Sequence, residues 1–332
     1  MKLKLLLASL AFMTFQVTLA KVTTPKMAKV GDLYYKLGTT MSSDGSFSAT
    51  VTYTGKYAQY DNEYSGNITI PESFTISSRN YRVMSIGDSA FYGCKSLVSV
   101  DIPNSVTSIG SYAFRGCTGL KKVIVSDIAA WCKISFGTTA SNPLYYAYHL
   151  YSDENTEITD LVIPDGVTSI SSYAFYDCTG LTNVSIPSSV TTIGDAAFHG
   201  CSGLASVSIP NSVTSIGSNA FEFCTGLKKV IVSDIAAWCK ISFENAASNP
   251  LYSAHHLYSD ENTEITDLVI PDGVTSISSY AFYDCTGLTN VSIPSSVTSI
   301  GDAAFVSCSG LTSVTIPKRV TNIGNSAFYG CI

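Results

Sequence analysis

Ten cysteines and four histidines are the side chains of this 332-residue sequence with the greatest chemical potential. Thiolates and imidazoles bind Zn²⁺ when they stand a few residues apart, and a histidine beside a serine or cysteine activates it as a nucleophile. No Cys-x-x-Cys pair occurs, and the only histidines close in sequence, His255 and His256, are adjacent and tend to point apart. Gly-x-Ser-x-Gly and phosphate-binding loop motifs are absent as well. We therefore expect no catalytic residue, no metal site and no cofactor.

The spacing of the cysteines instead indicates a repeat. Eight of them are separated by five intervals of 23 residues and two intervals of 61 residues. Residues 94–200 match residues 201–307 at all but about 15 positions, so the chain contains a tandem duplication of 107 residues, with a third copy from Cys308. A fixed period of 20 to 50 residues is typical of solenoids, whose repeats pack only against their neighbours.

The short unit has three parts. In one copy it reads Leu97-x-x-Val100-x-Ile102-Pro103, then Val106-x-x-Ile109-Gly110, then Ala113-Phe114-x-x-Cys117. The first part alternates apolar and polar side chains as a strand does, and its proline, which has no N–H, ends the strand. The second part is a short β-branched strand followed by a glycine that permits a turn. The third suits about one helical turn with its alanine, phenylalanine and cysteine facing inward.

Each 61-residue interval holds two coils, one of them enlarged. In the first copy, Asp127 is placed to cap a short helix that carries Trp131 and Cys132. A second short helix is expected to start at residues 141–143 and to run to about His149. The predicted fold is a β-rich leucine-rich-repeat solenoid of about ten coils, with a parallel sheet of short strands and short helical turns.

The cysteines at the shared repeat position stand next to an inward-facing phenylalanine. Equivalent residues of neighbouring coils approach the Cα separation of roughly 4.4–6.8 Å that a disulfide needs. Pairing neighbours would break the equivalence of the repeats, however, and a buried cysteine packs well as a small apolar side chain. We expect free, buried thiols.

The N-terminal part of the chain does not follow the repeat. Residues 1–20 have a basic start, a short apolar run and a small residue at Ala20, as a secretory signal peptide does. Residues 21–66 are expected to form an N-terminal β-cap over the first coil, and residues 67–332 the solenoid. No later stretch is apolar enough to span a bilayer, so the mature protein is expected to be secreted or held at the cell surface.

Charge is sparse. Charged residues make up 13% of the sequence, and the formal net charge is −6. Lysine and arginine do not cluster anywhere, which argues against nucleic acid or an anionic membrane as a partner.

Tyrosine is the strongest candidate for recognition, because it offers a large amphipathic contact at low entropic cost. The chain has 20, concentrated in the cap and in the enlarged coils, where Tyr146 and Tyr148 lie. Outward strand positions, among them Asp101 and Ser208, are expected to line one sheet face. These four residues form the candidate binding surface. Two alternatives stay open: the tyrosines pack the enlarged coil, and the polar face is only a solvated exterior.

The repeat resembles a known family. The unit at residues 97–117, 181–201, 204–224, 288–308 and 311–331 is similar to the BspA-type leucine-rich repeat of Bacteroides-group surface proteins. The segment Asp-Ile-Ala-Ala-Trp-Cys-Lys-Ile-Ser-Phe, at residues 127–136 and 234–243, resembles a variant in the same family.

The resemblance implies a secreted or cell-surface protein that mediates protein–protein interaction or adhesion to host or bacterial surfaces. Its partner would be a protein ligand from the host matrix or from a bacterial surface. Two alternatives remain: a glycan-binding surface module whose tyrosine rings stack on sugars, and a structural spacer for a missing C-terminal domain.

Overall fold

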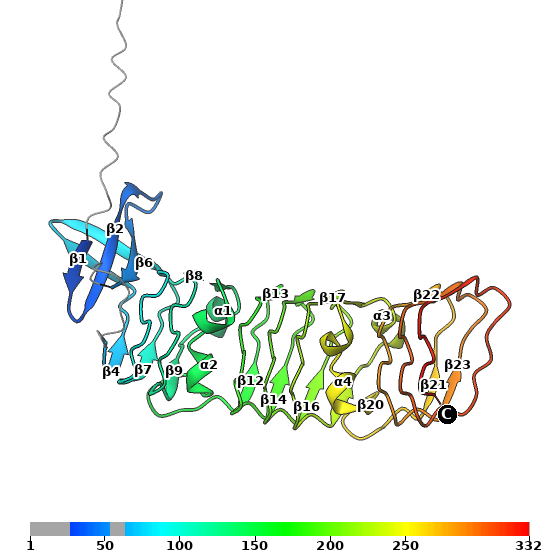
Figure 1. The fold of residues 1–332 in the computed structure, drawn as a ribbon. Coiled ribbons are helices and arrows are strands. Elements are labelled where there is room, and N and C mark those ends of the chain that lie inside the picture. The colour runs from blue at the N-terminus through cyan, green and yellow to red at the C-terminus, as the bar shows by residue number, and fades with distance from the viewer. Residues whose placement is uncertain (1–26, 54–63, 332) are drawn as a thin grey trace, which may run out of the picture.

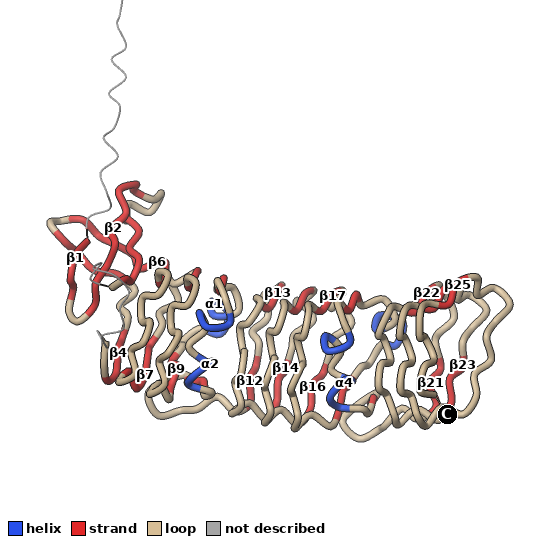
Figure 2. Tube along the Cα trace, in the orientation of Figure 1, coloured by secondary structure: helices blue, strands red, loops and turns tan. Residues whose placement is uncertain are grey.

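The computed structural model describes residues 27–53 and 64–331, and the predicted signal peptide lies outside these residues. The predicted fold is confirmed: the chain forms a β-solenoid of about 10 coils that extends as a gently curved rod (Figure 1). Its strands are short and are joined by longer loops and turns (Figure 2).

The first strands of successive coils form parallel ladders along one side of the rod. Val184, for example, pairs with Leu161 of the preceding coil and Val207 of the following one, so equivalent residues lie in register. The ladders are β4 (Gly66–Thr69), β7 (Leu97–Asp101), β9 (Lys122–Ile124) and β11 (Leu150–Tyr151); β12 (Asp160–Val162), β14 (Asn183–Ser185), β16 (Ser206–Ser208), β18 (Lys229–Ile231) and β20 (Leu257–Tyr258); and β21 (Asp267–Val269) and β23 (Asn290–Ser292).

The second strands of the coils, two residues long except for β6, form parallel ladders of their own on the upper side in Figure 1. They are β6 (Arg79–Ile86), β8 (Ser108–Ile109) and β10 (Ser135–Phe136); β13 (Ser169–Ile170), β15 (Thr192–Ile193), β17 (Ser215–Ile216) and β19 (Ser242–Phe243); and β22 (Ser276–Ile277), β24 (Ser299–Ile300) and β25 (Asn322–Ile323).

A layer of β-strands covers the N-terminal end, as predicted. β1 (Met27–Val30), β2 (Leu33–Met41) and β3 (Phe47–Thr52) are antiparallel, and β3 then pairs in parallel with β6. β5 (Ser73–Ile76) pairs antiparallel with β6, so the sheet of the cap passes directly into the second-strand ladder. The division of the chain at residue 66 remains a prediction, because strands on both sides of it share one sheet.

The segment 111–117 is not a helical turn, contrary to the expectation. Cys117 N–H bonds to Phe114 O within the coil, whereas Phe91 N–H of one coil donates to Ala113 O of the next. Alternate residues thus bond within and between coils, and two residues of the segment have positive φ. An α-helix satisfies its N–H groups internally and has negative φ throughout. The inward positions are as predicted, since Ala113, Phe114 and Cys117 are buried.

Each enlarged coil contains the two short helices expected. The Asp127 carboxylate accepts a hydrogen bond from Ala130 N–H (2.9 Å) at the start of the first helix. The second helix stops earlier than expected, because Tyr148 adopts a left-handed φ of 62°. The elements are α1 (Ile128–Trp131), the 3-10 turn Thr139–Ser141 and α2 (Leu144–Ala147), and in the second copy α3 (Ile235–Trp238), the 3-10 turn Ala246–Ser248 and α4 (Leu251–Ala254).

Buried side chains join the ladders where the strand pairing is interrupted. In the part of the chain that the structure describes, no strand pair links β11 to β12. Trp131 Nε1–H donates to Ala174 O across this gap (2.8 Å), and Asn142 Nδ2 donates to Tyr173 O (2.6 Å) and Ala174 O (3.2 Å). Trp238 and Asn249 make the equivalent bonds in the second copy. These side chains continue the stacking past each enlarged coil.

Rows of identical side chains fill the core. The rings of Phe91 and Phe114 stack with centroids 4.8 Å apart and an interplanar angle of 6°. Cysteine Sγ donates to a phenylalanine carbonyl of the preceding coil, as from Cys224 to Phe198 O (3.1 Å). All ten cysteines are free, in agreement with the expectation. Burial raises the pKa of the Cys224 thiol to about 12, so it stays protonated and unreactive near neutral pH.

Replacing Asn142 by Ala should lower the free energy of unfolding by about 2–4 kcal/mol, because a buried polar group left without a partner costs about 1–3 kcal/mol. The Asn142 side chain is fully buried, and it also accepts from Leu144 N–H (2.9 Å). Urea unfolding followed by tryptophan fluorescence measures the change. Asn155→Ala, in an exposed turn, is the control and should shift stability by less than about 0.5 kcal/mol. Equal losses in both variants would contradict the role assigned to Asn142.

The buried thiols predict that stability falls above pH 9. An unfolded thiol titrates near 9.0, whereas the pKa of Cys178 and of Cys224 in the folded chain is about 12. Between these values only the unfolded chain releases the protons, which favours unfolding by up to about 1.4 kcal/mol per thiol and pH unit; below 9 the effect vanishes. Urea midpoints from pH 7 to 10.5 should decline, and less steeply in the Cys178→Ala/Cys224→Ala variant. The same slope in both proteins would refute the prediction.

Candidate interaction surface

A row of aromatic side chains runs along the turn side of the central coils. Tyr145 packs against Tyr176 (ring centroids 5.8 Å apart), Tyr176 stacks on His199 (4.5 Å, 6°), and His199 meets Phe223 edge-on (5.2 Å, 84°). We call the row the aromatic strip; its members are Tyr145, Tyr146, Tyr173, Tyr176, His199 and Phe223.

The solenoid itself aligns the strip. Tyr176 and His199 each follow the buried phenylalanine of their coil, so they occupy the same repeat position 23 residues apart. Parallel stacking of coils places such positions side by side, at the roughly 4.8 Å spacing of neighbouring strands. Because these two rings face each other, their faces are covered and their edges remain at the surface.

Phe223 stands directly before the repeat cysteine, where the other coils have glycine, aspartate or serine. Its φ is 59°, and it is 60% exposed. A left-handed conformation costs a residue with a Cβ about 1–2 kcal/mol, and a well-exposed ring gains little from burial. The other residues at this position, all with positive φ, are Gly93, Gly116, Gly200 and Gly330, together with Asp177, Asp284 and Ser307. The left-handed turn is thus common to these coils, and what distinguishes Phe223 is a large exposed ring at a position that otherwise holds a small or polar residue.

Carboxylates flank the imidazole at the centre of the strip. His199 Nε2 is 3.6 Å from Glu222 Oε2, and His199 Nδ1 is 3.9 Å from Asp177 Oδ1. Among the described residues, that Nδ1 is buried without a hydrogen-bond partner. Burial, together with the Asp177 carboxylate, raises the pKa of Tyr176 to about 12, so its hydroxyl remains a hydrogen-bond donor.

A shallow hollow adjoins the strip. It has a volume of about 310 Å³, and its wall includes Tyr173, Tyr176, His199, Asp195 and Asn219. The hollow brings ring edges, an exposed carboxylate and an amide together on one surface.

Of the four residues predicted from the sequence, Tyr146 and Tyr148 lie together. They line a hollow of about 410 Å³ beside α2. The Tyr146 hydroxyl accepts a hydrogen bond from Gly116 N–H (2.8 Å), so this tyrosine also ties the enlarged coil to the coil before it. Tyr148 is 44% exposed and ends the helix.

Asp101 and Ser208 lie on different ladders. Asp101 ends β7 and Ser208 ends β16, and the break between β11 and β12 separates the two. Burial, with the Glu154 carboxylate, raises the pKa of Asp101. Neither residue lines the hollow of Tyr146 and Tyr148. The use of these four residues in binding remains a prediction.

Sequence reasoning missed Tyr176, His199 and Phe223 as one surface. Their adjacency depends on the register between coils, which a local pattern does not display. One signal was present: Phe223 is an aromatic residue directly before the repeat cysteine, where the other copies have glycine, aspartate or serine.

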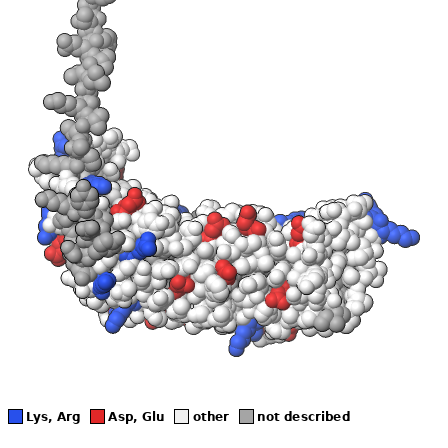
Figure 3. Space-filling model, in the orientation of Figure 1, with Lys and Arg blue, Asp and Glu red and all other residues white. Residues whose placement is uncertain are grey.

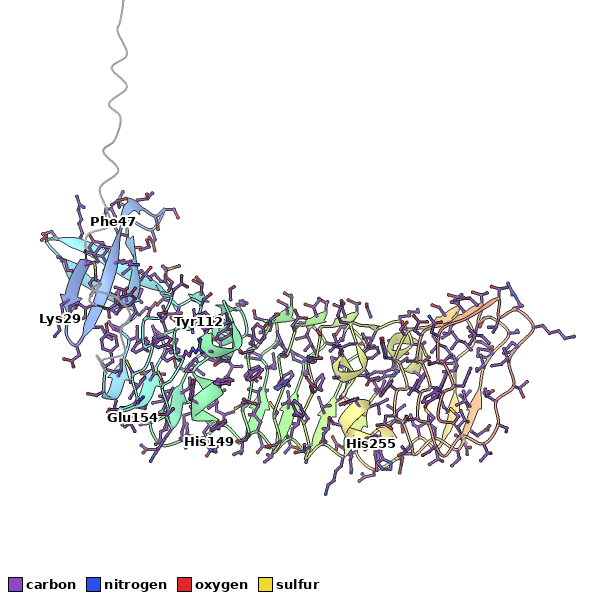
Figure 4. The ribbon with its side chains drawn as sticks, in the orientation of Figure 1. Lys29, Phe47, Tyr112, His149, Glu154 and His255 are labelled. Carbon is purple, nitrogen blue, oxygen red and sulfur yellow. The ribbon has the colours of Figure 1, made fainter. Side chains whose placement is uncertain are left out.

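The remaining histidines pair with carboxylates. His149 Nδ1 lies 2.6 Å from Glu157 Oε1, and the equivalent His256 lies 2.7 Å from Glu264. Figure 4 places His149 beside α2 and His255 beside α4; His255 is the equivalent of Tyr148 in the first copy. Within residues 27–53 and 64–331, no group of three or more His, Cys, Asp or Glu side chains is placed to hold a metal ion. In the same residues, no helix is long and apolar enough to cross a membrane.

Known proteins were compared with this chain. The sequence model described as "BspA type Leucine rich repeat region" matches in six copies, over residues 78–138, 149–251 and 256–332. A leucine rich cell surface protein of Faecalibacterium prausnitzii A2-165 has 29% identity and a TM-score of 0.53, over 93% of this chain and 81% of its own. The pneumococcal vaccine antigen PcpA, at 21% identity and a TM-score of 0.50 over 93% of this chain and 80% of its own, shares the fold.

A search of curated proteins found no match. The repeat sequence, the solenoid and the family match, which covers well over half of the chain, lead to one conclusion: this protein belongs to the BspA-type leucine-rich-repeat family.

Proposed function

We propose that this protein is displayed on the cell surface or secreted, and that it binds another protein through the aromatic strip. The observation that carries the proposal is Phe223, an aromatic ring that is 60% exposed at a position where the other coils have glycine, aspartate or serine. Membership in a repeat family with a protein-interaction role, and the cell-surface description of the Faecalibacterium relative, support it. The signal peptide predicted at residues 1–20 agrees with export.

A protein partner fits the strip better than a sugar. Sugars stack on exposed ring faces, but Tyr176 and His199 cover each other's faces at 4.5 Å, which leaves Phe223 as the well-exposed ring of the strip. Ring edges, hydroxyls and carboxylates are groups that a polypeptide can match with hydrogen bonds and apolar side chains. The spacer alternative does not account for Phe223, since a spacer needs no exposed aromatic ring at this position.

Surface plasmon resonance on the immobilised mature chain tests the function. Host matrix proteins and extracts of bacterial surface proteins are passed over it, with a glycan array in parallel. We expect at least one protein to bind, and binding to fall at least tenfold in the Tyr176→Ser/Phe223→Gly variant. Tyr283→Ser, the equivalent change in the second copy, is the control and should bind normally. Glycan binding without protein binding would favour the glycan module, and no binding at all would favour the spacer.

Phe223→Gly should leave the free energy of unfolding within about 1 kcal/mol of the wild type. Relief of the left-handed strain, about 1–2 kcal/mol, opposes the loss of an aromatic pair and the greater chain entropy of glycine. Thermal or urea unfolding measures it. Phe221→Ala, which truncates the fully buried neighbour, should instead cost about 3–5 kcal/mol. A comparable loss in both variants would show that Phe223 is a packing residue.

A further inference from the structure

We infer that the aromatic strip recognises a positively charged segment of its partner, an extended peptide whose arginine side chains lie against Phe223 and bond to the carboxylates of Asp177 and Glu222. The inference rests on the proposed function and names the chemistry of the partner.

Charge around the strip is one-sided. Asp177, Asp195 and Glu222 border it, and within residues 27–53 and 64–331 the only basic side chain within 4.0 Å of their carboxylates is His199. Asp177 and Glu222 are each only 26% exposed, so water screens them less than a fully exposed carboxylate. On the face shown in Figure 3, acidic side chains occupy the middle of the solenoid and basic ones lie mostly toward its ends. A cationic partner would provide a positively charged group to pair with these carboxylates.

Arginine matches this arrangement in shape as well as in charge. Its guanidinium donates bidentate hydrogen bonds to carboxylates, and its planar head and apolar stem pack against aromatic rings. Phe223 supplies an exposed ring next to both Glu222 and His199. Cation–π contacts of this kind are favourable at surfaces and stronger where water is partly excluded. The strip thus offers a ring and two carboxylates within two coil steps.

The second copy of the duplication has the same core without this surface. Between residues 146–200 and 253–307 only five positions differ. Four of the five lie on or beside the strip: Tyr146/Ser253, Tyr148/His255, His199/Val306 and Gly200/Ser307. In the next coil, Glu222 and Phe223 correspond to Tyr329 and Gly330. The strands were kept while the strip diverged, which is the pattern expected of a surface that is specific to one copy.

The substitutions also change which histidine the equivalent carboxylates of Asp177 and Asp284 contact. In the first copy Asp177 stands over Gly200, where any Cβ would overlap its oxygen, and faces His199. In the second copy the matching Asp284 turns to His255, with Oδ2 3.3 Å from Nδ1. An imidazole thus accompanies the carboxylate in both copies, but only the first copy directs it toward the strip.

Fluorescence anisotropy with dye-labelled peptides tests the inference on the full mature chain. The probe is Gly-Ser-Arg-Gly-Arg-Ser-Gly, and the reference peptide carries citrulline, which has the shape of arginine without its charge. We expect the arginine peptide to bind at least tenfold more tightly than the reference, and more weakly as salt rises. Glu222→Gln and Phe223→Gly should each weaken it at least tenfold. Asp284→Asn, in the second copy, is the matched control and should leave binding unchanged.

A transplant gives an independent readout. The variant His255→Tyr/Val306→His/Ser307→Gly/Tyr329→Glu/Gly330→Phe rebuilds the strip on the second copy, where the residues equivalent to Asp177 and Asp195 are already present. It should raise the stoichiometry from one peptide per chain to two.

The inference is overturned if citrulline binds as well as arginine, if Asp284→Asn weakens binding as much as Glu222→Gln, or if the wild type binds neither peptide. A protein partner that binds wild type and Glu222→Gln equally would leave the proposed function standing and remove only this inference.

Discussion

Hydrogen bonds between equivalent backbone groups of neighbouring coils are the constraint on which the rest of this structure depends. A coil of 23 residues cannot bury enough apolar surface to offset the entropy of ordering it, so it is stable only when stacked. In the turn segment, Phe91 N–H donates to Ala113 O of the next coil. The first strands and the second strands of neighbouring coils pair in the same way, each within its own ladder. The stacking fixes the register, and the register makes every repeat position into a row.

Rows explain both the core and the surface. Inside, the rule produces stacked phenylalanine rings and a line of thiols that donate to carbonyls of the preceding coil. On the surface, the register places the residue after the buried phenylalanine of one coil beside the equivalent residue of the next coil. Tyr176 therefore stacks on His199. A binding surface can therefore arise or disappear through a few substitutions, because the core that aligns it is unaffected by them. The two copies of the duplication illustrate this independence.

The enlarged coils interrupt the strand pairing between neighbouring coils, and other hydrogen bonds take its place there. Where β11 and β12 do not pair, the Trp131 indole and the Asn142 amide donate to carbonyls of the next coil. Together with the backbone bond from Ser171 N–H to Cys132 O, these side-chain bonds continue the stack. The same insertion brings Tyr145 and Tyr146 to the end of the strip. The enlarged coil thus interrupts the sheet, keeps the neighbouring coils in contact and extends the aromatic strip.

The sequence by itself determined the period, the number of coils, the inward-facing residues and the Asp127 cap, because these depend on residue types at fixed spacing along the chain. Only the tertiary structure decided how segment 111–117 bonds, since alternation between one coil and the next cannot be told from a helical turn by local pattern. It also separated Asp101 from Ser208 and gathered Tyr176, His199 and Phe223 into one surface. Such proximities are set by the register between coils and by the ladder breaks, which are contacts between residues 23 or more positions apart.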